Sequence, residues 1–163
     1  MGVIFYIAEG EIEERFFDFL KHNGFIRPGR FKKFNLTQDD LKNNSNILTT
    51  KVKQIFCILD TDFVDMEKLF NNISKLEKIC GNNVQMLVQN ENFEGELRYM
   101  LDCNDLCNFF KLPHHTTKDL KKYLAQDVDY SKFLSKDNLL RYCCRPNASI
   151  HYKNIIHLKD ILK

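Results

Sequence analysis

The chain alternates short apolar runs with amphipathic stretches, and this alternation is the feature that most limits its possible folds. Three apolar runs have the length and composition of strands buried on both faces, at residues 3–8, 55–59 and 84–88. A stretch with apolar residues at helical spacing follows each of them, at residues 11–20, 65–79 and 93–101. Strands that alternate with helices in this way predict an α/β fold with a mostly parallel, Rossmann-like sheet flanked by helices.

The last third of the chain has a different pattern, with short helix signals. We expect helices at residues 106–112, 117–124, 130–134, 136–142 and 155–162. The predicted organisation is therefore an α/β core over residues 1–102 and a helical extension over residues 103–163, packed together as one compact domain.

The segment between the first helix and the second apolar run carries turn signals. Pro28-Gly29 predicts a turn, and its flanks are expected to form a short hairpin or an extended loop. Thr37, with acids after it, is expected to cap a further helix.

Composition argues against two classes of protein. A net charge of +2 is too small for a chain that attracts nucleic acid through its overall field, so local basic clusters must supply any such contact. No apolar run approaches the ~20 residues of a membrane span, and Glu9 interrupts the first run too early for a signal peptide. We expect a cytoplasmic protein without membrane contact, whose cysteines are free thiols.

Two weaker patterns lie in the C-terminal third. Cys103 and Cys107 are followed by His114-His115, which leaves open a Cys/His metal site or ordinary thiols. The paired histidines suit acid–base work at neutral pH, or they simply lie in a polar loop.

Acidic residues follow the first two predicted strands. Glu9 ends the first strand beside Gly10, and Asp60 and Asp62 follow the second. Because the carboxyl ends of parallel strands meet at one edge of the sheet, these acids are expected to converge there. A set of carboxylates needs a compensating cation, and hard oxygen ligands suit Mg²⁺ or Mn²⁺. The alternative is that each acid merely caps the next helix. Glu11, Glu13 and Glu14 are interpreted as ordinary acids of the first helical turn, where the helix dipole favours negative charge.

These motifs resemble a known family. An apolar strand ending in Glu-Gly, then Glu-x-x-Glu with an aromatic-rich helix, then a strand ending in Asp-x-Asp, resembles the Toprim fold of topoisomerases, bacterial primases and OLD-type nucleases. The segment Asn90-Glu91-Asn92-Phe93-Glu94 is similar to the Asn-Pro-x-Phe-Glu segment of RloB-like proteins, Toprim-related proteins of phage-defence and abortive-infection loci. Glu91 stands where that family usually has proline. The resemblance covers residues 1 to about 102.

The resemblance implies a metal-dependent nuclease of DNA or RNA, with a setting in phage defence. On this chain it implies Asp60 and Asp62 as Mg²⁺ ligands, Glu9 as a ligand or general acid/base, and Glu94 as a further ligand or orienting group. It also suggests a partner ATPase or a homodimer. Two alternatives stay open: a non-catalytic Toprim-like module that binds nucleic acid or a partner, and a metal-dependent phosphotransferase or phosphatase acting on a small nucleotide.

Basic residues near these motifs are the candidates for contact with nucleic acid. They are Arg27, Arg30, Lys32 and Lys33 around the predicted turn, and Arg98 one turn after Glu94. Each is either a phosphate contact or a solvated surface charge.

Overall fold

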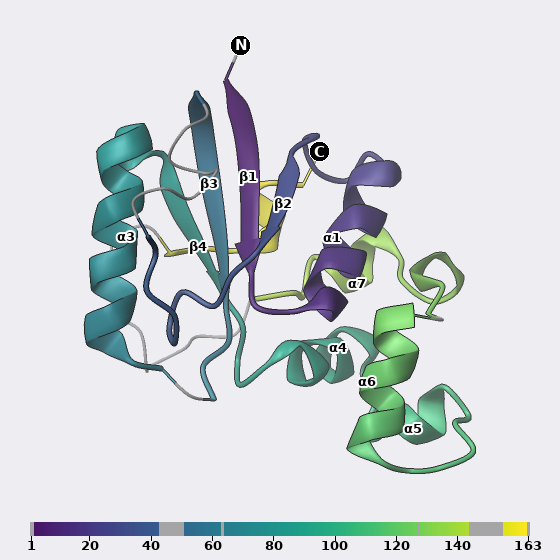
Figure 1. The fold of residues 1–163 in the computed structure, drawn as a ribbon. Helices are drawn as coiled ribbons and strands as arrows, with labels where there is room; N and C mark the ends of the chain where they lie inside the picture. The colour runs from purple at the N-terminus through teal and green to yellow at the C-terminus, as the bar shows by residue number, and fades with distance from the viewer. Residues whose placement is uncertain (1, 43–50, 63, 127, 144–154, 163) are drawn as a thin grey trace.

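The computed structural model describes residues 2–42, 51–62, 64–126, 128–143 and 155–162 of the 163-residue chain. In these residues five strands, all parallel, form one sheet in the order β2-β1-β3-β4-β5. The strands are β1 (Val3–Ala8), β2 (Arg30–Lys33), β3 (Val52–Leu59), β4 (Val84–Val88) and β5 (Ile155–Ile156). This sheet and its flanking helices confirm the predicted α/β class (Figure 1).

The described residues form six α-helices, and the first three agree closely with the periodic stretches predicted at residues 11–20, 65–79 and 93–101. They are α1 (Glu11–His22), α3 (Met66–Cys80), α4 (Phe93–Leu101), α5 (Leu106–Phe109), α6 (Thr117–Gln126) and α7 (Lys136–Leu139), with short 3₁₀ turns η1 (Gly81–Asn83), η2 (Tyr130–Lys132) and η3 (Leu158–Asp160). In the described part of the chain, none of these helices combines the length and apolar character that crossing a membrane requires.

The interior strand β1 packs a core on each of its faces. Ile4, Tyr6 and Ala8 belong to one buried cluster, and Phe5 and Ile7 belong to the other. Figure 1 shows α3 on one side of the sheet, with α1, α4, α6 and α7 on the opposite side. Because successive side chains of a strand point to opposite faces, burial on both sides explains the unbroken apolar runs.

Aromatic side chains join the C-terminal third to the sheet. The ring of Phe16, on α1, lies 5.4 Å from that of Tyr130 and 5.1 Å from that of Tyr142, measured between centroids. All three side chains are buried in the same cluster as Ile4 and Tyr6 of β1. The segment after α4 therefore shares a core with the sheet.

The two edge strands differ from the sequence-based expectations. Arg30–Lys33 pairs in parallel with Phe5–Ala8, where a hairpin or extended loop was expected. Ile155 and Ile156 pair with Met86 and Leu87 of β4, so the helix predicted for residues 155–162 is wrong. Both strands are short, and their pairing depends on neighbours that are distant in sequence. The C-terminal extension thus returns to the sheet and is not purely helical.

The chain makes a turn at Thr37, where a helix was expected to begin. The buried side chain of Asn72, on α3, donates to the carbonyl oxygens of Leu36 (2.9 Å) and Asp39 (2.7 Å). Its Oδ1 accepts from the backbone N–H of Leu41 at 2.8 Å. A helix would use such backbone groups within itself, so the contacts of Asn72 stabilise the turn instead.

The strand order places a topological switch at the carboxyl ends of β1 and β3. The chain leaves β1 through α1 to β2 on one side, and β3 lies against β1 on the other. In open α/β sheets, ligands bind in the crevice that forms at such a point.

Candidate active site

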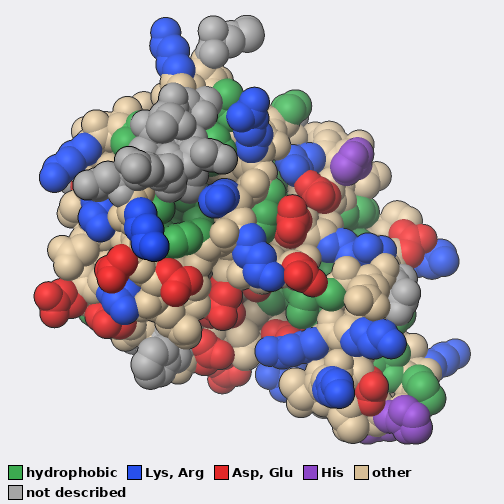
Figure 2. All heavy atoms as spheres, viewed as in Figure 1, with side chains coloured by type: hydrophobic (Ala, Val, Ile, Leu, Met, Phe, Trp, Pro, Cys, Tyr) green, Lys and Arg blue, Asp and Glu red, His purple; other side chains and the backbone are tan. Residues whose placement is uncertain are grey.

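Acidic side chains from three strand ends line one cavity at the switch point. The cavity has a volume of about 460 Å³, and its acidic lining residues are Glu9, Glu11, Glu13, Asp60, Asp62 and Glu94. The structure therefore brings the four acids predicted as catalytic, Glu9, Asp60, Asp62 and Glu94, to the same place. In Figure 2, acidic side chains gather on the lower part of this face, where the strands of Figure 1 end.

None of the predicted acids caps the helix that follows it. Asp65 caps α3, with its carboxylate accepting from the N–H of Lys68 at 3.0 Å, and Gly10 occupies the cap position of α1. The cap of α4 is Asn92, one residue before the helix begins. The alternative interpretation of Glu9, Asp60 and Asp62 as helix caps is therefore wrong.

The loops after β3 and β4 are tied together by Thr61. Its hydroxyl donates to the carbonyl of Gln89 at 2.9 Å and accepts from the N–H of Glu91 at 2.9 Å. The N–H groups of Thr61 and Asp62 both donate to the carbonyl of Glu91, at 2.7 and 3.1 Å. Glu91 has a φ of 69°, a left-handed conformation that turns its carbonyl into this position. These bonds fix the Asp60–Asp62 segment against the start of α4.

Glu13 is a site residue that the sequence analysis missed. It stands at the third position of α1, and its side chain is only 6% exposed. A Cβ placed on Gly10 would lie 2.8 Å from Oε2 of Glu13, so glycine at this position leaves room for the carboxylate. The sequence offered one signal, a glycine three residues before a glutamate at a helix start, which matches the arrangement in which a side chain reaches back to the cap N–H.

Burial, together with the crowding of carboxylates, raises the pKa values of Asp60, Glu13 and Glu9. Burial, and then the neighbouring charges of Glu13, Glu9, Asp62 and Glu94, raise the pKa of Asp60 to about 8. Burial is also the main cause that raises the pKa of Glu13 to about 7, against the opposing effect of backbone N–H groups. The pKa of Glu9 is raised as well, by burial and then by Asp62. Neighbouring carboxylates therefore add to burial in disfavouring the charged forms of Asp60, Glu13 and Glu9.

Two lysines border the acidic cavity. Lys33, at the end of β2, forms an ion pair with Glu11 at 3.2 Å, and Lys121 of α6 lies 3.8 Å from Oε1 of Glu94. This Glu94 oxygen is buried and has no hydrogen-bond donor in the described residues. Lys33 was predicted from the sequence, whereas Lys121 was not, because α6 lies far along the chain.

The other predicted basic residues are not among those that line the acidic cavity. Arg30 and Lys32 pair with Phe5 and Ile7 within the sheet, before the strands end. Arg27 borders a separate cavity that also contacts the first half of β3. Of the four basic residues near the predicted turn, only Lys33 reaches the acids.

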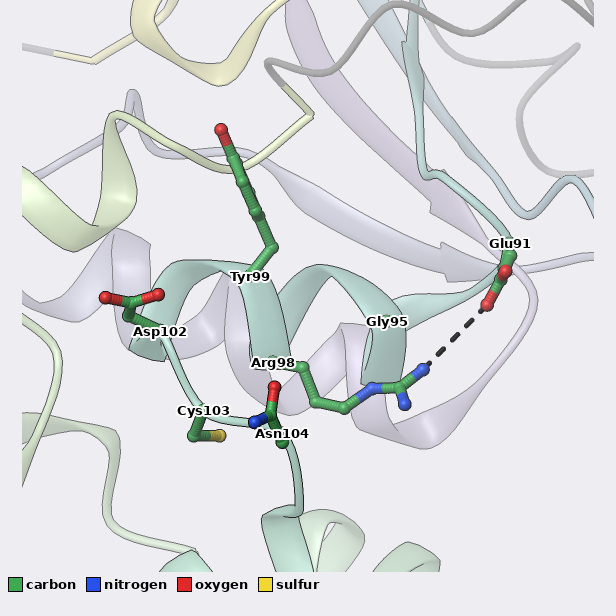
Figure 3. A pocket seen from close by; sticks show the side chains of 7 residues that line it. All are labelled: Glu91, Gly95, Arg98, Tyr99, Asp102, Cys103 and Asn104. Atoms are coloured by element: carbon green, nitrogen blue, oxygen red, sulfur yellow. Dashed lines mark ion pairs between the residues drawn. The ribbon is translucent and has the colours of Figure 1, made fainter.

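Arg98, on α4, is not among the residues that line the acidic cavity. Its guanidinium is 3.8 Å from the carboxylate of Glu91, and the two side chains point toward one another in Figure 3. Tyr99 points the other way from the same helix. Arg98 lines the pocket of Figure 3 and also a cavity that contains Glu94.

The carboxylates suit a divalent cation in their chemistry. Their donor atoms are all oxygens, the preferred ligands of Mg²⁺ and Mn²⁺, and a cation would offset the mutual repulsion that raises the pKa of Asp60. As placed in the described residues, no three Asp, Glu, His or Cys side chains stand close enough to form a ready ligand set. An ion would therefore have to draw the carboxylates of Glu9, Asp60 and Asp62 together.

The cysteines and histidines of the C-terminal third were the other metal-site candidates. Cys103, Cys107, His114 and His115 form no metal-holding group in the described structure. The two histidines are exposed, and His115 lies 3.9 Å from the carboxylate of Asp105.

Comparison with protein-family models, with curated proteins and with solved structures found no match for this chain. The function is therefore inferred from the geometry and chemistry of the acidic cavity.

Proposed function

We propose that this protein is a metal-dependent nuclease that hydrolyses a phosphodiester bond of DNA or RNA at the acidic cavity. The observation that carries the proposal is the convergence of carboxylates from three strand ends at the topological switch point, with none of the predicted acids acting as a helix cap. The resemblance of the Glu-Gly and Asp-x-Asp motifs to those of Toprim proteins supports the same reaction class.

The proposal assigns Glu9, Asp60 and Asp62 to holding a Mg²⁺ or Mn²⁺ ion. When bound, such an ion polarises the phosphoryl oxygen and makes an attacking water more acidic. Of the three, Asp60 is partly buried at the carboxyl end of β3, where opposite charges interact more strongly than in water, whereas Glu9 and Asp62 are exposed to solvent.

Glu13 is suited to proton transfer. Its raised pKa of about 7 lies near neutral pH, where a general base is most effective. In hydrolysis the oxygen of water forms a bond to phosphorus and gives its proton to this carboxylate. The bond between phosphorus and the leaving sugar oxygen breaks, and that oxygen takes up a proton. Lys33 and Lys121 face the same cavity and can balance the charge of the phosphate.

Incubation of the protein with labelled single- and double-stranded DNA and RNA tests the proposal. Cleavage is expected with Mg²⁺ or Mn²⁺, and neither with EDTA nor in the double variant D60N/D62N. Asp137→Asn, an exposed acid in the first turn of α7, is the matched control and should cleave as the wild type does. Binding without cleavage under every condition would overturn the nuclease and favour a non-catalytic binding module.

A further inference from the structure

A second cavity adjoins the acidic one along α4 and α6. It has a volume of about 440 Å³ and shares three lining residues with the acidic cavity, namely Asn92, Glu94 and Lys121. Its far end is bordered by Arg98 and Asn104. The two cavities therefore form a trough that begins at the carboxylates and passes between α4 and α6.

The two cations of the second cavity, Arg98 and Lys121, both have exposed side chains. The Arg98 side chain is 47% exposed and lies 3.8 Å from the carboxylate of Glu91. The Lys121 side chain is 61% exposed and lies 3.8 Å from the carboxylate of Glu94. The Arg98–Glu91 pair is exposed on both sides and contributes little to stability, so Arg98 can turn to an incoming anion at small cost. Glu94 is only 15% exposed, so Lys121 is expected to stay beside it and to contact the anion from there.

Asp105, which lines the second cavity together with Glu94, already accepts hydrogen bonds from the protein. Asp105 accepts hydrogen bonds at Oδ1 from the N–H groups of Cys107 (2.8 Å) and Asn108 (3.1 Å). Its Oδ2 accepts from the side-chain amide of Asn108 at 2.8 Å. The negative charge of Asp105 is thus directed to the start of α5, which leaves the cations better placed to receive an anion.

We propose that the trough binds a single strand of nucleic acid, with the phosphate next to the scissile one held between Lys121 and Arg98. This inference rests on the proposed nuclease function and names its substrate as a polynucleotide strand. Cavities of about 440 and 460 Å³ have the size of small-ligand sites, so each accommodates about one nucleotide and not a duplex.

The strand's tight contact is expected to end at Arg98. The pocket beyond it, of about 320 Å³, is lined by the acids Glu91 and Asp102 as well as by Arg98 (Figure 3). These carboxylates disfavour a further phosphate. The trough therefore has room for the scissile phosphate and one neighbour on this side.

Binding of a labelled 12-nucleotide single strand, followed by fluorescence anisotropy with Ca²⁺ in place of Mg²⁺, tests the inference. Arg98→Ala is expected to raise Kd about tenfold, the effect of losing one charge-assisted contact at a partly exposed site. The slope of log Kd against log salt should become shallower by about 0.7, the loss of one phosphate contact on a single strand. Arg98→Lys should keep the slope, because it keeps the charge. Arg27→Ala removes an exposed arginine that borders a different cavity and should bind as the wild type does.

A small diester, bis(p-nitrophenyl) phosphate, separates this inference from the proposed function. Arg98→Ala should raise the KM for the oligonucleotide several-fold more than the KM for this small diester, which has no neighbouring phosphate. If the wild type hydrolyses the small diester but Arg98→Ala binds the strand normally, the trough is wrong and the nuclease stands. If nothing is hydrolysed yet Arg98→Ala loses affinity and salt slope, the trough stands and the nuclease is wrong. Equal weakening by Arg27→Ala, or tighter binding of a duplex, also overturns the inference.

Discussion

Replacing Asp60 by asparagine is expected to change how the stability of the metal-free protein depends on pH. The pKa of Asp60 is raised from an ordinary value of 3.8 to about 8 in the folded protein. An acid with a raised pKa binds its proton more tightly when the protein is folded. Its contribution to stability is therefore complete below about pH 4 and is lost as the pH rises through about 8. The asparagine side chain has no acidic proton to lose, so the Asp60→Asn variant should lack most of this loss.

The pKa values give the size of the effect. Proton linkage for a single group with these two pKa values amounts to about 4 kcal/mol between pH 5 and pH 9. Asp60 is half-buried, and screening by solvent reduces this to about 2–4 kcal/mol. Because Glu13 contributes to the raised pKa of Asp60, the contributions of the two groups overlap and are not summed. For a chain of this length the loss corresponds to a fall in Tm of roughly 5–15 °C.

Thermal unfolding from pH 5 to pH 9, in EDTA and in excess Mg²⁺, measures both parts of the prediction. In EDTA the Tm of the wild type should fall steadily toward pH 9, and that of Asp60→Asn should fall much less. At pH 8, Mg²⁺ at about one hundred times its Kd should stabilise the wild type by about 2.7 kcal/mol. The same Mg²⁺ should stabilise Asp60→Asn by less than about 1 kcal/mol, because one proposed ligand has lost its charge.

Asp137→Asn is the matched control, since this exposed acid lies on α7 and not in the acidic cavity. It should reproduce both the pH slope and the Mg²⁺ response of the wild type. A wild-type Tm that is flat or rises between pH 5 and pH 9 in EDTA would refute the reasoning about Asp60. An equal response of Asp60→Asn to Mg²⁺ would refute its assignment as a ligand.

Four further substitutions test single features of the structure. Glu13→Gln should lower kcat about a hundredfold or more with KM nearly unchanged, as expected for loss of a general base. A kcat within fivefold of the wild-type value would contradict the assignment of Glu13 as general base. Gly10→Ala should displace the Glu13 carboxylate and lower activity more than tenfold while Tm changes by less than about 2 °C. Full activity of this variant would show that the acidic cavity tolerates a methyl group. Asn72→Ala should lower the free energy of unfolding by about 2–4 kcal/mol in urea, because three backbone groups lose their partner. Gly29→Ala places a methyl group 2.7 Å from the ring of Tyr6, and should cost about 1–3 kcal/mol in the same assay. For both of these, a loss below about 0.5 kcal/mol contradicts the contacts described.

The parts of the fold that the sequence predicted are those with long periodic signals. The apolar runs of β1, β3 and β4, and the stripes of α1, α3 and α4, are each set by residues close together in the chain. The short edge strands β2 and β5 carry no such signal, since a strand of two to four residues is defined by the neighbour with which it pairs.

The same distinction separates the site residues that were predicted from the sequence from those that were missed. Glu9, Asp60 and Asp62 follow strands directly, so the parallel sheet alone predicts that they meet. Glu13 looks like any acid in the first turn of a helix, and only the packing of α1 against the sheet buries it. Lys121 was missed because nothing local connects α6 with the first strand.

The energetics of the acidic cavity bear on why these residues are acids. A buried carboxylate that stabilises its own fold is one that accepts several hydrogen bonds, as Glu96 does from the N–H groups of Asn90 and Cys143 at 2.8 and 2.9 Å. Asp60 shows the opposite balance, because burial and neighbouring charge raise its pKa to about 8. Its charged form weakens the fold, and the caps of α1 and α3 do not require it. A residue that costs stability and caps no helix is best explained by a ligand, and a divalent cation is the ligand that would reverse the cost.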